Sequence, residues 1–303
     1  MQWQPAILAI LVMVVASSPL LAQGRGKARA QDFNPTQFFD QFLGTNDKIR
    51  DAELAKIDIS RKEENRLGEQ ELKAFKERLA QKDIKLSTRG SEVTYLSRLL
   101  ADLQPCLRQA KRYSKFQVHY YEVDDPQAYM LSGGQLLISS GLLEQVGSEA
   151  ALVCVLGHEL AHLDRGHLLR RAKQLKLMQQ RMKSPGEFSP EKMFQSFDSM
   201  QQLFRRPFGP EEELEADRDG IQWAWKLGYD PRAIEALYAA LDKADPGEFS
   251  PAFLRTHPPS AERRENLAAT FAELEKRAVD DELYLGRENL RRRIAKSEQE
   301  FDE

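Results

Sequence analysis

The sequence predicts an α+β fold that is mostly helical around a small β-sheet. Segments with helical periodicity occupy residues 47–80, 91–103, 148–170 and 211–226, whereas only two short segments alternate as a half-buried strand does. The chain has 303 residues and is 41% hydrophobic, so it can bury a sizeable core. We therefore predict one main domain over residues 47–270, with appended segments at either end.

The charge balance excludes some classes of partner. The chain carries 44 Lys and Arg against 47 Asp and Glu, which gives a formal net charge of -3. No global basic field therefore attracts nucleic acid or an anionic membrane surface, and we predict no nucleic-acid partner. The two cysteines, Cys106 and Cys154, lack C-x-x-C spacing, which argues against a thiolate metal site or a disulfide scaffold. Whether they pair after export is left open.

The N-terminal region carries a long uncharged apolar run, residues 5–22. We predict that residues 1–22 are a signal peptide removed during export to the periplasm or cell envelope. The alternative is a single retained membrane anchor, and only in that case would the chain contact a membrane. Residues 23–46 show no sustained period and are predicted to be a linker.

The remaining segments are assigned from their patterns. Residues 116–121 alternate as a strand that places His119 on its polar face, and residues 132–140 predict a second strand opened by two glycines. Residues 183–212 combine Pro and Gly and are predicted to form a loop with a short helix, which could act as a lid. The highly charged residues 271–303 predict a solvated helical tail.

Three of the five histidines lie within the segment VLGHELAHLDRGH, residues 155–167. On a helix, His158 and His162 are four residues apart and share one face, so both can bind one metal ion. Glu159 is offset by one residue, which places its carboxylate beside a metal-bound water. This H-E-x-x-H arrangement is typical of zinc hydrolases and predicts one Zn²⁺ per chain, with Glu159 as general base. The alternative is a pair of helical histidines without a metal.

A catalytic zinc ion needs a third protein ligand. The continuation typical of metzincins would place Gly and His where this chain has Arg165 and Leu168, so that class is excluded. His167 lies five residues after His162, which turns it away from the chelating face, and we expect it beside a ligand or at the surface.

We expect a glutamate from the helix predicted at 211–226 to be the third ligand instead. Its acidic candidates are Glu211, Glu212, Glu213 and Glu215. Glu213 is favoured because Asp217 follows four residues later and can accept the N–H of a ligand histidine. The alternative is an acidic first turn that complements the helix dipole.

Four motifs in this order resemble a known family. HELAH (158–162), ELEAD (213–217), the preceding SGGQLLIS and the later THPPSAER are similar to the gluzincin metallopeptidases that include the CaaX prenyl protease, HtpX and periplasmic BepA-type enzymes. The resemblance spans residues 59–267. It implies a zincin-like fold with zinc held by His158, His162 and Glu213, and with Glu159 as base.

The resemblance also implies roles for residues outside the two metal motifs. Asp217 matches the aspartate that supports a zinc ligand, and His257 and Arg263 match positions near the active site. We expect His257 either to stabilise the oxyanion or to occupy the open position on zinc and keep the enzyme latent. The chain departs from the family pattern NAFALPGG at Gln127 and Ser132, which affects the local cleft.

The expected function is that of an exported zinc endopeptidase in envelope protein quality control. Its predicted partners are unfolded, misassembled or membrane-associated polypeptides. We expect such a substrate to add to an unpaired strand edge, formed by Gln135, Leu136, Leu137, Ile138 and Ser139. The alternatives are a chaperone-like envelope protein with a residual zinc site and a hydrolase of small or modified substrates.

Overall fold

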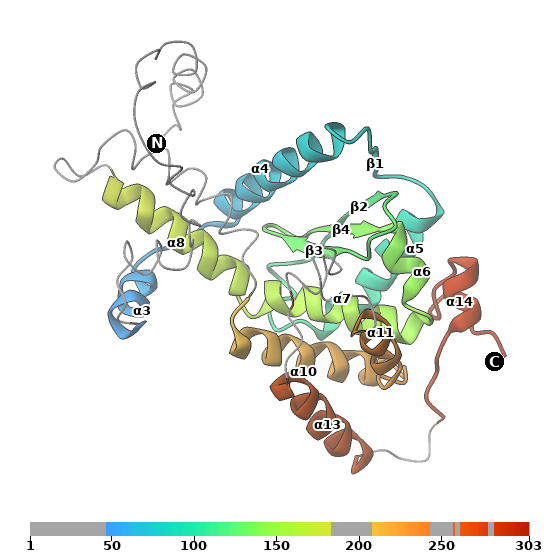
Figure 1. Ribbon diagram of the computed structural model, residues 1–303. Helices are drawn as coiled ribbons and strands as arrows, with labels where there is room; N and C mark the ends of the chain where they lie inside the picture. Colours follow the sequence, from blue (N-terminus) through green and yellow to red (C-terminus); the bar gives the residue numbers. More distant parts are fainter. Residues whose placement is uncertain (1–46, 183–207, 243–256, 258–260, 278–281, 303) are drawn as a thin grey trace, which may run out of the picture. The chain divides into compact units, whose positions relative to one another are not determined.

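The computed structural model describes residues 47–182, 208–242, 257, 261–277 and 282–302. The predicted signal peptide, the linker and most of the predicted lid lie outside the described residues. The helices are α3 (Asp47–Ala55), α4 (Arg61–Ala80), α5 (Ser91–Leu103), α6 (Ser140–Gln145), α7 (Glu149–Asp164), α8 (His167–Met182), α10 (Pro210–Lys226), α11 (Ala233–Asp242), α13 (Ala261–Glu275) and α14 (Arg287–Arg292). The strands are β1 (Leu86–Ser87), β2 (Gln117–Tyr121), β3 (Ala128–Leu131) and β4 (Gln135–Ser139). The predicted α+β class is confirmed (Figure 1).

The sheet has the strand order β1-β2-β4-β3. β4 pairs with β2 in parallel and with β3 antiparallel, so it is an interior strand. The expectation that Gln135–Ser139 offers an unpaired edge is therefore wrong. All five β4 residues are buried, as a continuous apolar run between two neighbours requires. The edge nearest the predicted catalytic helix is β3, which the sequence did not reveal as a strand because only four residues form it.

Both faces of the sheet are covered. One face contributes Val118, Leu136 and Ile138 to the main core, which includes α5 and α7. The other face lies under α4, whose Leu72, Phe75 and Leu79 pack against Tyr121 and Leu137. This cover explains a second correction: His119, predicted on a polar face, is only 3% exposed, and its Nε2 lies 3.1 Å from Gln135 Oε1.

The helix that carries the histidines is buried along its whole length. Ser148 begins it as predicted, with Oγ accepting a hydrogen bond from Ala151 N. The predicted continuation past residue 170 is wrong, because α7 ends at Asp164 and α8 begins at His167. Gly166 lies between them with φ 81°, a left-handed conformation that ends a helix and that glycine adopts without strain.

Helix α10 packs directly on α7, and two glycines set their distance. A Cβ atom on Gly157 of α7 would lie 2.8 Å from the Cα of Gly220. A Cβ on Gly220 would lie 2.8 Å from both the Cys154 backbone oxygen and the His158 backbone nitrogen. The two backbones therefore approach more closely than any side chain would allow.

The C-terminal segment is not the solvated helix predicted for it. In residues 282–302 only Arg287–Arg292 is helical, and Leu290 and Ala295 are buried. The Glu149 and Ala150 backbone N–H groups, at the start of α7, donate to the carbonyls of Gly286 and Leu285. Helix N-termini leave such groups without an intrahelical partner, so this segment completes the hydrogen bonding of α7.

Two further observations concern features outside the site. Cys106 and Cys154 are both free thiols in the structure, and burial raises the pKa of Cys154 above its ordinary value. Among the described residues, no helix combines the length and the hydropathy needed to cross a bilayer.

The close contact of α7 and α10 makes a prediction about stability. Gly220→Ala should lower the free energy of unfolding by about 1–3 kcal/mol, because its Cβ would meet backbone atoms that cannot move independently. Urea denaturation followed by circular dichroism measures the change. Gly209→Ala is the matched control, since its Cβ would make only an ordinary van der Waals contact, at 3.7 Å from Glu212 Oε2. Equal losses for the two variants would contradict the role given to the glycine contact.

Candidate metal centre and active site

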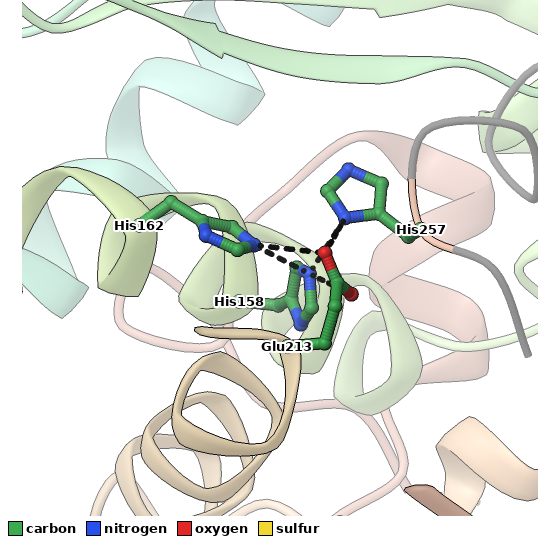
Figure 2. A group of neighbouring side chains, drawn as sticks. All are labelled: His158, His162, Glu213 and His257. Atoms are coloured by element: carbon green, nitrogen blue, oxygen red, sulfur yellow. Dashed lines mark hydrogen bonds and ion pairs between the residues drawn. The ribbon is translucent and has the colours of Figure 1, made fainter. Parts of the chain in front are cut away.

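Four buried side chains from separate parts of the chain converge on one point (Figure 2). His158 and His162 project from adjacent turns of α7, Glu213 comes from α10, and His257 precedes α13. One ligand atom from each residue lies within 4.8 Å of every other. The structure thus brings together the three predicted ligands and adds His257 to them.

The distances between these atoms fit a tetrahedral metal ion. The His158 Nε2 atom lies 3.1 Å from both His162 Nε2 and His257 Nδ1. The Glu213 Oε1 atom lies 3.0 Å from His257 Nδ1 and 3.6 Å from His162 Nε2. Ligands bound tetrahedrally at about 2.0–2.1 Å lie about 3.3 Å from one another. Glu213 Oε2 is buried and makes no hydrogen bond, but it lies 3.1 Å from Arg263 Nη1 in an ion pair that compensates part of its charge.

Both helix histidines have a partner on the ring nitrogen that points away from the centre. His158 Nδ1 donates to Asp217 Oδ1 at 2.9 Å. His162 Nδ1 lies 2.9 Å from His167 Nδ1, and His167 Nε2 lies 3.2 Å from Glu215 Oε2. A proton on Nδ1 of each helix histidine directs its Nε2 lone pair at the centre. Burial lowers the pKa of His162 well below its ordinary value, which favours this neutral form.

The predicted partners of the ligands occupy the expected places. Arg263 Nε and Nη2 donate to the two carboxylate oxygens of Asp217 at 2.7 and 2.8 Å. Its Nη1 donates to the His257 carbonyl at 2.9 Å. Burial alone would raise the pKa of Asp217, but Arg263 and His158 hold it well below its usual range. Asp217 therefore stays ionised and can fix the tautomer of His158.

Glu159 lies beside the four donor atoms. Its Oε2 accepts a hydrogen bond from the Met130 backbone N–H of β3 at 2.8 Å. Its Oε1 is 3.1 Å from His257 Nε2. The carboxylate is thus held between the edge strand and His257, where it can act on a water bound at the centre. This is the position predicted for a general base.

His257 contacts the metal cluster and the base at the same time. Its Nδ1 faces Glu213 and its Nε2 faces Glu159. Burial alone would lower its pKa, but these two carboxylates raise the pKa of His257 to about 9. Without a metal the ring therefore carries a proton on both nitrogens at neutral pH. A metal ion held by Nδ1 would displace the proton there and leave the Nε2–H to donate to Glu159.

The sequence did not identify some residues that shape the site. Phe208, just before α10, stacks on the His162 ring with centroids 3.6 Å apart, and the Arg171 guanidinium lies over the same phenyl ring. Tyr238 OH donates to Asp217 Oδ1 at 3.3 Å. No spacing rule connects these residues to the two motifs. The one local signal is the aromatic residue of RRPFGP, next to a Pro-initiated helix.

The fold and this site define a class of protein: a zincin-like metallopeptidase. Its parts are a helix with two converging histidines and a glutamate beside them, a glutamate from a second helix and an adjacent edge strand. The chain belongs to peptidase family M48, whose model matches residues 94–270. The family membership predicted from HELAH and ELEAD is confirmed.

Similar proteins come from mitochondria and from bacteria. The mitochondrial metalloendopeptidase OMA1 of Arabidopsis thaliana is 29% identical over 174 residues, 54% of this chain and 34% of that protein. Human OMA1 is 27% identical over 216 residues, 66% of this chain and 41% of that protein. The β-barrel assembly-enhancing protease of Escherichia coli K12 is 29% identical over 162 residues, 48% of this chain and 32% of that protein. The matched regions thus span less than half the length of these relatives.

The geometry distinguishes the acidic residues of α10. Glu213→Gln should reduce the bound metal well below one ion per chain, because an amide is a weaker ligand than a carboxylate. Glu215→Gln is the matched control: Glu215 contacts His167 and Arg165 rather than the centre, so its metal content should stay near the parent's. Elemental analysis of the purified variants measures both. A metal loss confined to Glu215→Gln would transfer the ligand role to that residue.

Proposed function

We propose that the protein is a zinc-dependent endopeptidase that cuts unfolded or misassembled polypeptides in the cell envelope. The observation that carries this proposal is the convergence of His158, His162 and Glu213 beside Glu159, itself hydrogen-bonded to an edge strand. Membership in peptidase family M48 and the metalloendopeptidase names of similar proteins support it.

The roles of this chain's residues follow from their positions. Zn²⁺ at the donor atoms would supply a Lewis acid that polarises the scissile carbonyl and lowers the pKa of water. Glu159 takes the proton from the attacking water and passes it to the leaving amine. Asp217, held by Arg263, keeps His158 in the tautomer that binds the metal.

The edge strand β3 is the proposed site for the substrate backbone. It pairs with β4 on one side only, and Met130 brings its outward N–H to the base. A polypeptide that adds a strand here uses main-chain hydrogen bonds, which carry little sequence preference. Such binding requires an extended chain, which unfolded proteins provide and folded ones do not.

His257 closes the proposed site in its resting form. Its Nδ1 would supply a fourth donor atom beside those of His158, His162 and Glu213, and a tetrahedral zinc held by all four would have no position left for water or substrate. We propose that His257 must move before a substrate is cut. The same closed geometry favours the second candidate function, a chaperone-like envelope protein with a residual zinc site. Hydrolysis of an unfolded protein separates the two.

The cellular location is proposed from the N-terminal sequence and from one relative. The apolar run at residues 5–22 supports export, and the β-barrel assembly-enhancing protease of Escherichia coli carries a name that fits envelope protein quality control. The OMA1 relatives are named as mitochondrial. Export, cleavage of the segment and the membrane-associated substrates stay predictions.

The role of the base is tested by one substitution. Glu159→Gln should retain about one zinc per chain but slow cleavage of an unfolded protein about 10²- to 10⁴-fold, because the amide cannot accept the water's proton. Gel-based cleavage rates and elemental analysis measure the two quantities, with a chelator as a second control. Glu144→Gln, on the exposed side of α6, should cleave like the parent. Undiminished cleavage by Glu159→Gln would remove Glu159 from the role of base.

The role of His257 is tested by the sign of a rate change. If its Nδ1 holds the resting site closed, His257→Ala should cleave an unfolded protein about tenfold faster than the parent while it keeps its zinc on the three remaining ligands. Turnover at saturating substrate is the measurement. A rate about 10² to 10³ lower would instead indicate an oxyanion donor, and an unchanged rate would leave His257 as a residue of the turn before α13.

A further inference from the structure

A second carboxylate lies on the same open edge of β3 as the base. The Ser132 N–H, just after β3, donates to Glu71 Oε2 at 2.9 Å, as the Met130 N–H donates to Glu159. Met130 belongs to β3 and Ser132 is the first residue of the turn that follows it, and the hydrogen bonds of both N–H groups go to carboxylates rather than to β4. The intervening Leu131 faces the other way, since its carbonyl accepts from Gly134 N. Glu159 and Glu71 therefore follow one another along the proposed substrate edge.

Helix α4 is built to hold Glu71 in this position. A Cβ on Gly68 would lie 1.9 Å from the Ser132 carbonyl oxygen, so only glycine lets the helix approach this closely. Arg61 Nη2 donates to the Gly133 carbonyl at 3.0 Å, and Ser132 Oγ donates to Glu71 Oε1 at 3.0 Å. Helix α4 lies outside residues 94–270, the stretch that the family model matches.

The positive charge that acts on the Glu71 carboxylate comes from Arg171, which lowers the pKa of Glu71 against the larger effect of burial, while its own guanidinium lies over the Phe208 ring. Both oxygens of its half-buried carboxylate accept hydrogen bonds from Ser132, and none of the ion pairs between described residues involves Glu71. Burial raises the pKa of Glu71 to about 7. A half-buried carboxylate of this kind is stabilised by a positive group that reaches it.

We propose that Glu71 is a specificity-determining residue that binds a primary ammonium group of the polypeptide substrate. This inference rests on the proposed endopeptidase function. A substrate strand antiparallel to β3 places the residue opposite Ser132 two positions, about 7 Å, on the N-terminal side of the residue opposite Met130. Because Glu71 already accepts the Ser132 N–H hydrogen bond, a substrate carbonyl cannot accept from the same N–H group. The substrate instead presents a lysine side chain or its own α-ammonium.

The test measures peptide binding without hydrolysis. Fluorescent peptides are titrated at pH 8 into protein carrying Glu159→Gln, alone or combined with Glu71→Gln. One peptide series replaces lysine by norleucine at successive positions, and a second compares free with acetylated N-termini. In the protein with Glu71 intact, the charged peptide of one series should bind about tenfold more tightly than its neutral counterpart. A charge-assisted hydrogen bond provides a difference of this size. Glu71→Gln should bring that ratio to about one.

Controls separate charge from structure. Glu69→Gln removes a charge from an exposed position of α4 and should keep the tenfold ratio. Glu71→Asp keeps the charge and should keep part of the preference, even if Glu71→Gln lowers the unfolding midpoint. The series that shows the preference identifies lysine or the N-terminus as the source.

Two results would overturn the inference. Equal binding of charged and neutral peptides, including no binding of either, would show that Glu71 recognises no ammonium group. A preference that persists in Glu71→Gln would assign it to another residue. Failure of the endopeptidase proposal is recognised separately, as absence of unfolded-protein cleavage by the parent, because the binding ratios do not depend on hydrolysis.

Discussion

The backbone contact between Gly157 of α7 and Gly220 of α10 is the constraint on which the rest of the site depends. It brings the two helices close enough for Glu213 to lie 3.6 Å or less from the nearest ring nitrogens of His158 and His162. A single β-carbon at this contact would separate the helices, and the donor atoms would no longer fit one tetrahedral ion. The metal site is therefore a consequence of helix packing as much as of its ligands.

This packing buries several charges, and the structure compensates most of them in pairs. Asp217 is held by Arg263, and Asp219 accepts hydrogen bonds from Arg108 and Arg165. Removing either partner of such a pair leaves a buried charge uncompensated, which is strongly destabilising. These pairs also fix the rotation of α10 about its axis, because Asp217 and Asp219 must each meet a different partner. Glu213 is then directed at the histidines.

The proposed catalytic groups are engaged with one another in the structure. Glu159 bonds to the edge strand and faces His257, while His257 also faces Glu213. A substrate that pairs with β3 must compete with Glu159 for the Met130 N–H, so substrate binding and release of the base are coupled. The same edge continues to Glu71, where a carboxylate again occupies a backbone donor. In the proposed mechanism, substrate alignment and the state of the site would thus both depend on one short strand.

The sequence by itself determined what local helix geometry controls. His158, Glu159 and His162, and likewise Glu213 and Asp217, are placed relative to one another by the four-residue repeat of a helix. Only the tertiary structure decided that β3 lies at the edge of the sheet and that His119 is buried. It also decided that α7 ends before Gly166, a glycine in the left-handed conformation, and that residues 282–302 accept the hydrogen bonds of the first turn of α7. It also brought His257 next to the ligand atoms of His158, His162 and Glu213, and Glu71 next to the Ser132 N–H just after β3. These contacts join residues far apart in the chain, and strand order and helix docking depend on the packing of the whole core rather than on any local period.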